Sequence, residues 1–238
     1  MDLTIVIAVF NEVECITPLL DEIGVCFVAE TGYEVIVVDD GSIDGTAAVL
    51  QAARQSHPGL RILHHRECYG QSAAIASGVK AAGTQWIATL DGDGQNDPAD
   101  ILKLYQVMDE SPDDVHMVAG FRKQRKDDWL KRMASRIANS VRDAVLHDNS
   151  PDSACGLRLF ARTTFLNLPQ FDHMHRFLPA LVQRQGGKVL SVEVSHRKRL
   201  RGQSKYGIHN RLWVGIIDTL GVRWLQRRGT QPVVSEIE

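Results

Sequence analysis

The chain has 238 residues, a formal net charge of −2, 44% hydrophobic residues and 24% charged residues. This composition is ordinary for a soluble globular protein, and the length suffices for one α/β domain with a large core. No repeat, low-complexity segment or long linker divides the chain, and no run approaches the roughly 18 uninterrupted apolar residues of a membrane-spanning helix.

In the first half, strand-like apolar runs alternate with helical patterns. Runs rich in Val and Ile predict buried strands at residues 3–10, 33–38, 60–64, 85–90 and 115–119. Helical patterns fill the gaps at 15–29, 46–56, 71–82 and 99–109. This alternation predicts a mainly parallel, Rossmann-like α/β sheet flanked by helices, with ligands at the carboxyl ends of the strands.

After Arg122 the pattern changes. Residues 123–145 predict a basic helix, 157–161 a strand, 176–185 a helix and 188–194 a last strand. We therefore expect one large domain at 1–206 and a helical appendage at 207–238. In the appendage, apolar residues with Trp213 and Trp224 near the two ends are interleaved with arginines. Such an amphipathic helix suits a membrane headgroup layer, or a packing face on its own domain or on a second subunit.

The small net charge conceals a strong asymmetry. Residues 196–228 contain nine Lys or Arg and a single acid, Asp218, so the rest of the chain is acidic. A basic tail on an acidic body indicates an anionic partner such as phosphate, nucleic acid or a membrane surface, or else a solvated basic helix. The four cysteines form no CxxC or zinc spacing, which favours reduced thiols in a cytosolic protein.

The stretch DGDGQ at 91–95 directly follows a predicted buried strand. Its oxygen-bearing side chains, Asp91, Asp93 and Gln95, stand at alternate positions, which is a pattern for holding a hard divalent cation beside a phosphate. An EF-hand loop would need glycine at its sixth position and an acid at its twelfth, where this chain has Asn and Leu. An Asp-Gly turn requires fewer acids. We therefore predict metal binding.

A second acidic pair, Asp39 and Asp40, ends the predicted strand at 33–38. Capping of the next helix would explain one acid and leave the other over. We expect the two strands that end in these acids to be neighbours in the sheet. Their carboxylates would then converge on a shared cation in a nucleotide site. Neither GxGxxG after the first strand nor GxxxxGK[ST] occurs, which argues against dinucleotide binding and P-loop hydrolysis. Gly70, at a predicted helix start, is either a phosphate-binding position or an ordinary loop end.

Five segments resemble, in order and in spacing, the motifs of family 2 glycosyltransferases. They are AVFNE at 8–12, VVDDGSIDGT at 37–46, DGDGQNDP at 91–98, DSACGLRLF at 152–160 and RGQSKY at 201–206. The last two resemble the polyprenyl-phosphate sugar transferases, the branch similar to dolichol-phosphate mannosyltransferase. The resemblance implies a GT-A fold, a GDP- or UDP-sugar donor, Mg²⁺ or Mn²⁺, and a dolichyl or undecaprenyl phosphate acceptor at the cytoplasmic membrane face, with no nucleic-acid partner.

The resemblance also implies residue roles. Donor-nucleotide binding falls on Ala8, Phe10, Glu12, Asp39, Asp40, Gly70, Asp91 and Gly92. The metal ligands would be Asp91, Asp93 and Gln95. The catalytic set would be Asp91, Asp93, Arg201 and Lys205, with the last two clamping the donor phosphates. Acceptor-phosphate binding falls on Arg122, Arg132 and Ser135.

An acceptor phosphate is already anionic at neutral pH, so it can attack the anomeric carbon directly, with inversion and without a strong general base. A saccharide or other hydroxyl acceptor in cell-envelope polysaccharide synthesis would instead need a carboxylate base, for which Asp97, Asp152 and Asp172 are candidates. A third hypothesis is a non-enzymatic nucleotide-binding or nucleic-acid-binding protein that uses its basic face. Many relatives carry membrane helices after the catalytic domain; here only the amphipathic tail follows, so we expect peripheral attachment, a membrane partner protein, or a homodimer formed through the tail.

Overall fold

The computed structural model describes residues 1–123, 142–197 and 208–228. The described strands are β1 (Leu3–Val9), β2 (Tyr33–Asp39), β3 (Leu60–His64), β4 (Trp86–Asp91), β5 (Val115–Phe121), β6 (Arg158–Ala161) and β7 (Lys188–Glu193). The helices are α1 (Ile16–Cys26), α2 (Thr46–Ala53), α3 (Gln71–Ala81), α4 (Ala99–Asp109), α6 (Arg162–Leu166), α7 (Leu178–Arg184) and α8 (Ile208–Arg227). A 3₁₀ turn at Met174–Phe177 leads into α7.

These strands form one sheet in the order β3-β2-β1-β4-β6-β5-β7. The first four strands are parallel to one another, and β5 is parallel to β7. β6 runs antiparallel between β4 and β5. The predicted mainly parallel sheet is confirmed. The prediction that the two acid-bearing strands are neighbours is wrong, because β1 pairs with both β2 and β4 and separates them.

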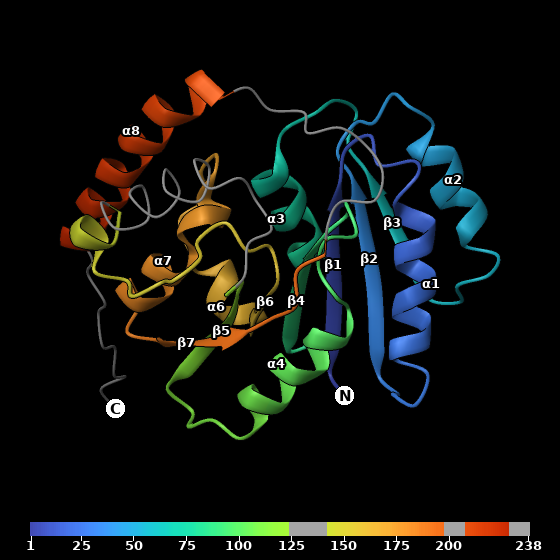
Figure 1. The fold of residues 1–238 in the computed structure, drawn as a ribbon, viewed down its shortest axis with the longest axis horizontal. Coiled ribbons are helices and arrows are strands. Elements are labelled where there is room, and N and C mark those ends of the chain that lie inside the picture. Colours follow the sequence, from blue (N-terminus) through green and yellow to red (C-terminus); the bar gives the residue numbers. More distant parts are fainter. Residues whose placement is uncertain (124–141, 198–207, 229–238) are drawn as a thin grey trace, which may run out of the picture.

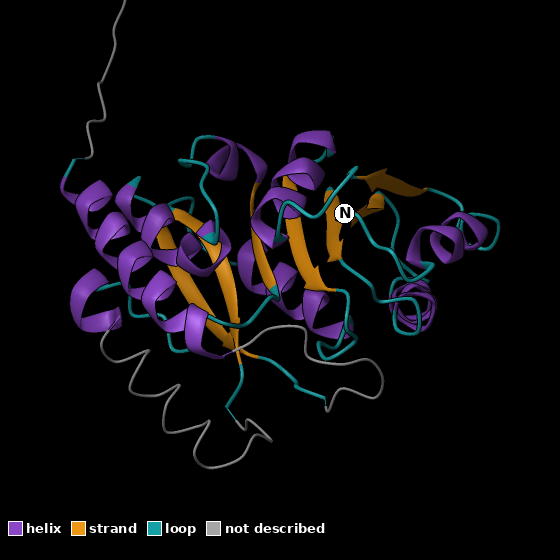
Figure 2. Cartoon of the chain, turned by 90° about the horizontal axis from the view of Figure 1, so that it is seen from above, coloured by secondary structure: helices purple, strands orange, loops and turns teal. Residues whose placement is uncertain are grey.

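The sheet is the middle layer of the molecule (Figure 2). One core cluster packs α1, α2 and α4 against one face, and a second packs α3, α6 and α7 against the other. Successive β1 side chains pack on opposite faces of the sheet. Ile5 and Ile7 belong to the first cluster and Val6 to the second, and all three are fully buried. Burial on both faces explains why the parallel strands read as continuous apolar runs.

The predicted elements of the first half are confirmed, with helix ends up to three residues shorter, as for α1. In the second half the predicted strands at 157–161 and 188–194 correspond to β6 and β7, and the predicted helix at 176–185 begins two residues later as α7. The predicted basic helix at 123–145 lies mostly outside the described residues, although 142–146 are helical. The division into 1–206 and 207–238 stays a prediction.

α8 lies along the outside of α7 (Figure 1). Val222 is 1% exposed, and Arg184 Nε donates to the carbonyl of Leu225 at 2.8 Å, so one face of α8 packs on the domain. The other face carries exposed apolar side chains, namely Ile216, Ile217, Leu220 and Trp224. In the described part of the chain, no helix has both the length and the apolar character needed to cross a bilayer.

Candidate active site at the carboxyl end of the sheet

Three parallel strands bring the acidic motifs to one edge of the sheet. The strands β2, β1 and β4 lie side by side in this order (Figure 1). Because they are parallel, Asp39 at the end of β2 and Asp91 at the end of β4 lie at the same edge, on either side of the β1 end. Ligands of open α/β sheets bind at this edge. The prediction that the acidic strand ends share one edge is therefore confirmed, even though one strand separates them.

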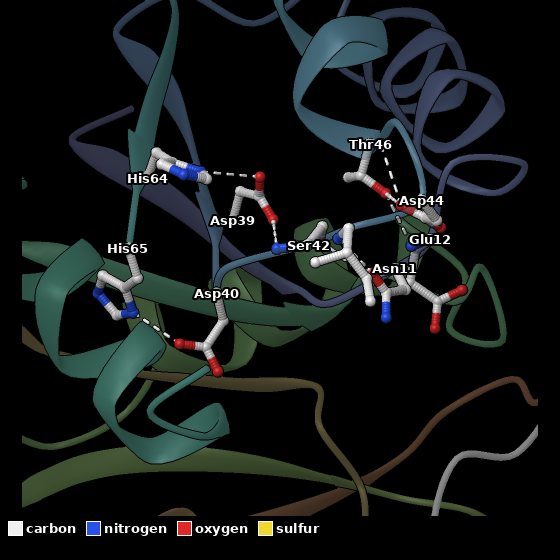
Figure 3. Close-up of polar contacts among 10 residues, drawn as sticks. Asn11, Glu12, Asp39, Asp40, Ser42, Asp44, Thr46, His64 and His65 are labelled. Atoms are coloured by element: carbon white, nitrogen blue, oxygen red, sulfur yellow. Dashed lines mark hydrogen bonds and ion pairs between the residues drawn. The ribbon is translucent and has the colours of Figure 1, made fainter. Parts of the chain in front are cut away.

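The loops after β1 and β2 hold each other (Figure 3). Asn11 has a left-handed backbone with φ 54°. Its backbone N–H donates to Ser42 Oγ at 2.8 Å, and its side-chain Oδ1 accepts from the Ile43 N–H at 2.7 Å. The Glu12 N–H donates to Thr46 Oγ1 at 3.0 Å. These hydrogen bonds hold Glu12, which is predicted to bind the donor nucleotide, in a turn next to the end of β2.

Asp39 is fully buried and has a partner on each carboxylate oxygen (Figure 3). Oδ1 accepts from the Ser42 N–H at 3.1 Å. Oδ2 lies 3.0 Å from Nδ1 of His64, whose side chain is half exposed. Asp39 is therefore oriented by its own strand end and by β3, and His64 is the part of this pair that reaches the surface.

Asp40 fills a cradle of donors at the start of α3. Its Oδ1 accepts from His65 Nδ1 at 2.6 Å and from the Tyr69 N–H at 3.0 Å. Its Oδ2 accepts from the Gly70 N–H at 2.7 Å and from Cys68 Sγ at 3.2 Å. Burial alone would raise the pKa of Asp40, but these hydrogen bonds, His65 first among them, hold it below its ordinary value. The Gly70 N–H thus donates to the Asp40 carboxylate, and the donor-binding role of Gly70 stays a prediction.

Replacing Asp40 by asparagine is expected to lower the free energy of unfolding by about 2–3 kcal/mol, because buried N–H donors lose a charged acceptor. The folded pKa of Asp40 lies below the unfolded value of about 3.9, so this contribution is present above about pH 4 and is lost as the pH falls through the folded pKa. Urea unfolding at pH 7 and in acid, with the exposed Asp109→Asn as control, measures both effects. Equal midpoints for wild type and Asp40→Asn at pH 7 would contradict this role.

Asp91 and Asp93 form a like-charged pair at the end of β4. Gln71 Nε2 donates to Asp91 Oδ1 at 2.8 Å, and Asp93 Oδ1 accepts from the Gln95 N–H at 3.1 Å. Burial, and then the charge of Asp93, raise the pKa of Asp91 to about 6, against the opposing charge of Arg158. A cation bound beside the two carboxylates would offset their mutual repulsion and favour the ionised form of Asp91.

The pair fits a divalent cation that shares its coordination with a substrate. Mg²⁺ is typically bound by one or two carboxylates together with substrate phosphates and water, rather than by a cage made only of protein. Within the described ranges, no three His, Cys, Asp or Glu side chains come together as a metal site. The observation that supports a cation here is that two carboxylates, Asp91 and Asp93, stand together at the carboxyl end of β4.

Gln95, the third predicted ligand, connects the loop at 91–95 to a distant part of the chain. Its side-chain Nε2 donates to the backbone carbonyl of Arg197 at 3.3 Å, and its backbone carbonyl accepts from the Arg197 N–H at 2.9 Å. Asn96 and His196 form an isolated antiparallel bridge beside it. The loop is thus paired with the residues that directly precede the segment containing Arg201 and Lys205.

Arg122, predicted to bind the acceptor phosphate, is paired with Asp152. Its Nε donates to Asp152 Oδ2 at 2.6 Å and its Nη2 to Oδ1 at 3.0 Å. Burial opposes the effect, yet Asp152 raises the pKa of Arg122. Asp97, another candidate base, accepts from the Ala99 N–H at the start of α4 and lies 2.6 Å from Arg197. Asp172 is exposed on the turn before α7.

A buried arginine beside Asp91 was missed from the sequence. Arg158, at the start of β6, is 3% exposed and donates to the carbonyls of His175 at 2.6 Å and Ser153 at 2.8 Å. Ser72 Oγ lies 2.7 Å from His175 Nδ1. Burial, and then the charge of Arg158, hold the pKa of His175 well below its ordinary value, so its ring is neutral at pH 7. The sequence feature that could have revealed a buried, paired arginine is its position inside the apolar run Leu-Arg-Leu-Phe.

The remaining predicted positions divide into two groups. Ala8 and Phe10 lie at the end of β1 and just beyond it, and Gly92 packs against Val9, where an added Cβ would lie 2.4 Å from Val9 Cγ1. The other predicted residues, Arg132, Ser135, Arg201 and Lys205, lie outside the described residues. Their roles stay predictions.

A family model supports the resemblance carried by the motifs. The model of glycosyl transferase family 2 matches residues 4–168, more than half of the chain, so the chain belongs to this family. Dodecaprenyl-phosphate galacturonate synthase of Rhizobium johnstonii is 31% identical over 237 residues, covering 98% of this chain and 69% of that protein. The undecaprenyl-phosphate 4-deoxy-4-formamido-L-arabinose transferase of Serratia proteamaculans is 34% identical over 209 residues, covering 86% of this chain and 63% of that protein.

Solved structures show the same fold at lower identity. Glucosyl-3-phosphoglycerate synthase from Mycobacterium tuberculosis in complex with Mg²⁺ and UDP matches with a TM-score of 0.70 at 17% identity, over 93% of this chain and 78% of that chain. Its complex with Mn²⁺, UDP and glucosyl-3-phosphoglycerate matches with a TM-score of 0.69 at 17% identity, over 93% and 79% of the two chains. The predicted GT-A architecture is confirmed.

Proposed function

We propose that this protein transfers a sugar from a nucleotide-sugar donor, a GDP- or UDP-sugar, to a polyprenyl phosphate, with Mg²⁺ or Mn²⁺ held by Asp91 and Asp93. The observation that carries the proposal is the like-charged, partly buried carboxylate pair at the strand edge where α/β sheets bind nucleotides. The names of the relatives support a polyprenyl-phosphate acceptor, because each of them is called a transferase or synthase acting on such a lipid. The chain spans 63% of the length of the second relative, so the activity is proposed and not transferred from it.

The donor would lie across the three strand ends. Glu12 and Asp39 would contact its nucleoside, and the β4 end would face the diphosphate. A divalent cation held there supplies neutralisation of the charge that grows on the departing nucleoside diphosphate. Arg201 and Lys205, in the RGQSKY segment, would clamp the same phosphates. The support is the backbone pairing of residues 95–96 with 196–197, because residue 197 directly precedes the stretch that contains this segment.

A phosphate acceptor agrees with the state of the candidate bases. A carboxylate that accepts two hydrogen bonds from a guanidinium is a weak base, which argues against Asp152. Asp97 is similarly committed to Arg197 and to the start of α4. The Arg122–Asp152 pair uses Nε and Nη2, so Arg122 would meet the acceptor phosphate through Nη1. The phosphate would attack the anomeric carbon, the bond to the diphosphate would break, and the sugar would invert.

We further infer that the enzyme works at the inner face of the membrane, bound to its surface through α8. The support is the outward stripe of Ile216, Ile217, Leu220 and Trp224, which is followed by the exposed Arg227 and Arg228. An apolar stripe with aromatic and cationic neighbours suits an anionic headgroup layer. The acceptor's prenyl chain would bring the reacting phosphate to that same layer.

One assay tests this function. The purified protein is given a panel of UDP- and GDP-sugars with Mn²⁺, and either prenyl phosphate in anionic vesicles or soluble saccharide acceptors. We expect a sugar-prenyl phosphate product of inverted configuration by NMR, cosedimentation of the protein with the vesicles, and loss of turnover in EDTA. Transfer to saccharides alone, or turnover unaffected by EDTA, would contradict the proposed reaction; a protein that stays in the supernatant would contradict the membrane attachment.

A further inference from the structure

The first turn of α3 contacts three different parts of the site through three consecutive residues. The Gly70 N–H donates to Asp40 Oδ2 at 2.7 Å, at the β2 end. Gln71 Nε2 donates to Asp91 Oδ1 at 2.8 Å, at the β4 end. Ser72 Oγ lies 2.7 Å from His175 Nδ1, in the turn that also accepts from Arg158. The position of Gln71 is therefore fixed on both sides by neighbours that have their own buried partners.

Two neighbours confine the Asp91 carboxylate. Gln71 Nε2 donates to its Oδ1 at 2.8 Å. The backbone of Gly156 leaves no spare room beside it, because a Cβ at that position would lie 2.2 Å from Asp91 Oδ2 and 2.3 Å from both Cγ and Oδ1. A carboxylate held in this way has a defined rotation, and the lone pairs that Gln71 does not use have a defined direction. Such outer hydrogen bonds commonly orient carboxylate ligands of metals.

We propose that Gln71 is a positioning residue whose side-chain amide holds Asp91 in the rotation in which it binds the cation of the donor complex; this rests on the proposed function. A neutral donor is suited to the task. A lysine or arginine at this position would neutralise charge that a divalent cation needs, and a glutamate would repel Asp91 and offer no N–H. The amide of Gln71 orients the carboxylate and leaves its negative charge in place.

The chain contains a matched control for this hydrogen bond. Gln106 Nε2 donates to Glu110 Oε1 at 2.9 Å on the exposed surface of α4, away from the strand edge. Gln106→Ala therefore removes a glutamine–carboxylate bond of the same kind outside the site. Gln71→Glu provides a second comparison, because it preserves the size and shape of the side chain and removes the N–H donor.

The experiment titrates Mn²⁺ in the presence of UDP or GDP, for the wild type and for Gln71→Ala, Gln71→Glu and Gln106→Ala. It also compares the thermal midpoints of the four proteins. We expect the Mn²⁺ half-saturation concentration to rise about 10- to 100-fold in both Gln71 variants, as is typical when the outer partner of a metal ligand is removed. The thermal midpoint without metal should stay near that of Gln106→Ala, and nucleotide binding without Mn²⁺ should be unchanged.

Three results would overturn the inference. An unchanged Mn²⁺ half-saturation in Gln71→Ala shows that Asp91 needs no such support. A wild-type value in Gln71→Glu shows that the N–H donor is not needed. Weaker nucleotide binding without Mn²⁺ shows that Gln71 contacts the diphosphate itself. If the wild-type protein binds neither UDP nor GDP in a Mn²⁺-dependent way, the proposed function is wrong and this inference falls with it.

Discussion

Replacing Asp93 by alanine is expected to reduce turnover by about 10³-fold, because a metal that neutralises a leaving diphosphate contributes several kcal/mol to the transition state. The fold should survive. Asp93 adds to the raised pKa of Asp91 through like-charge repulsion, so its removal relieves repulsion in the metal-free protein. Initial rates with a nucleotide sugar and prenyl phosphate, together with Mn²⁺ titrations, measure the loss.

Asparagine at the same position separates charge from loop geometry. Asp93 Oδ1 accepts a hydrogen bond from the Gln95 N–H, and the amide oxygen of an asparagine can accept the same bond. Asp93→Asn should therefore keep the loop and still lose most of the turnover. Near wild-type rates in Asp93→Asn would mean that the loop needs the turn and not the carboxylate, which would remove the metal role assigned to this residue.

Replacing Gly156 by alanine is expected to reduce turnover about 10²-fold and to lower the free energy of unfolding by about 1–3 kcal/mol. The added Cβ would lie 2.2 Å from Asp91 Oδ2 and 2.3 Å from Cγ, so the Asp91 side chain must move. The carbonyl of Gly156 also accepts from Thr89 Oγ1 at 2.7 Å, which limits how far the backbone can retreat. Kinetics and urea unfolding of the variant measure the two losses.

The control for this substitution is Gly24→Ala in α1, where an added Cβ would meet nothing within 4 Å. Alanine favours a helix interior over glycine, so this variant should keep full activity and unfold at the same or slightly higher urea concentration. If Gly156→Ala behaves like Gly24→Ala, the close approach of residue 156 to Asp91 has no functional importance.

The sequence predicts the acid-bearing strand ends well because their signal is local. An apolar run of Val and Ile followed directly by Asp39 or by Asp91 indicates both a buried strand and the place where it ends. Parallel pairing then puts such ends at one edge of the sheet, whatever the strand order. This is why the shared edge of the acidic strand ends could be predicted, although the prediction that β2 and β4 are neighbours was wrong.

Long-range contacts account for what the sequence did not reveal. The placement of β6, antiparallel between β4 and β5, depends on pairings such as Ala88 with Leu159, which no local pattern encodes. Gln71 and Asp91 are 20 positions apart, and nothing in either neighbourhood indicates that one holds the other. The hydrogen bonds from the loop before α3 to the Asp40 carboxylate are equally absent from any local pattern, and the donor-binding role of Asp40 stays a prediction.

The loop at 91–95 is held by parts of the chain that are synthesised much later. Thr89 reaches Gly156 across 67 positions, and Gln95 reaches Arg197 across 102. A fragment ending after α4 would contain Asp91, Asp93 and the ends of β1, β2 and β4. It would lack the hydrogen-bond partners of Thr89 and Gln95. We therefore expect the amino-terminal half alone to lack an ordered loop at 91–95, and a chimera or a split protein to regain it only when both halves reassociate.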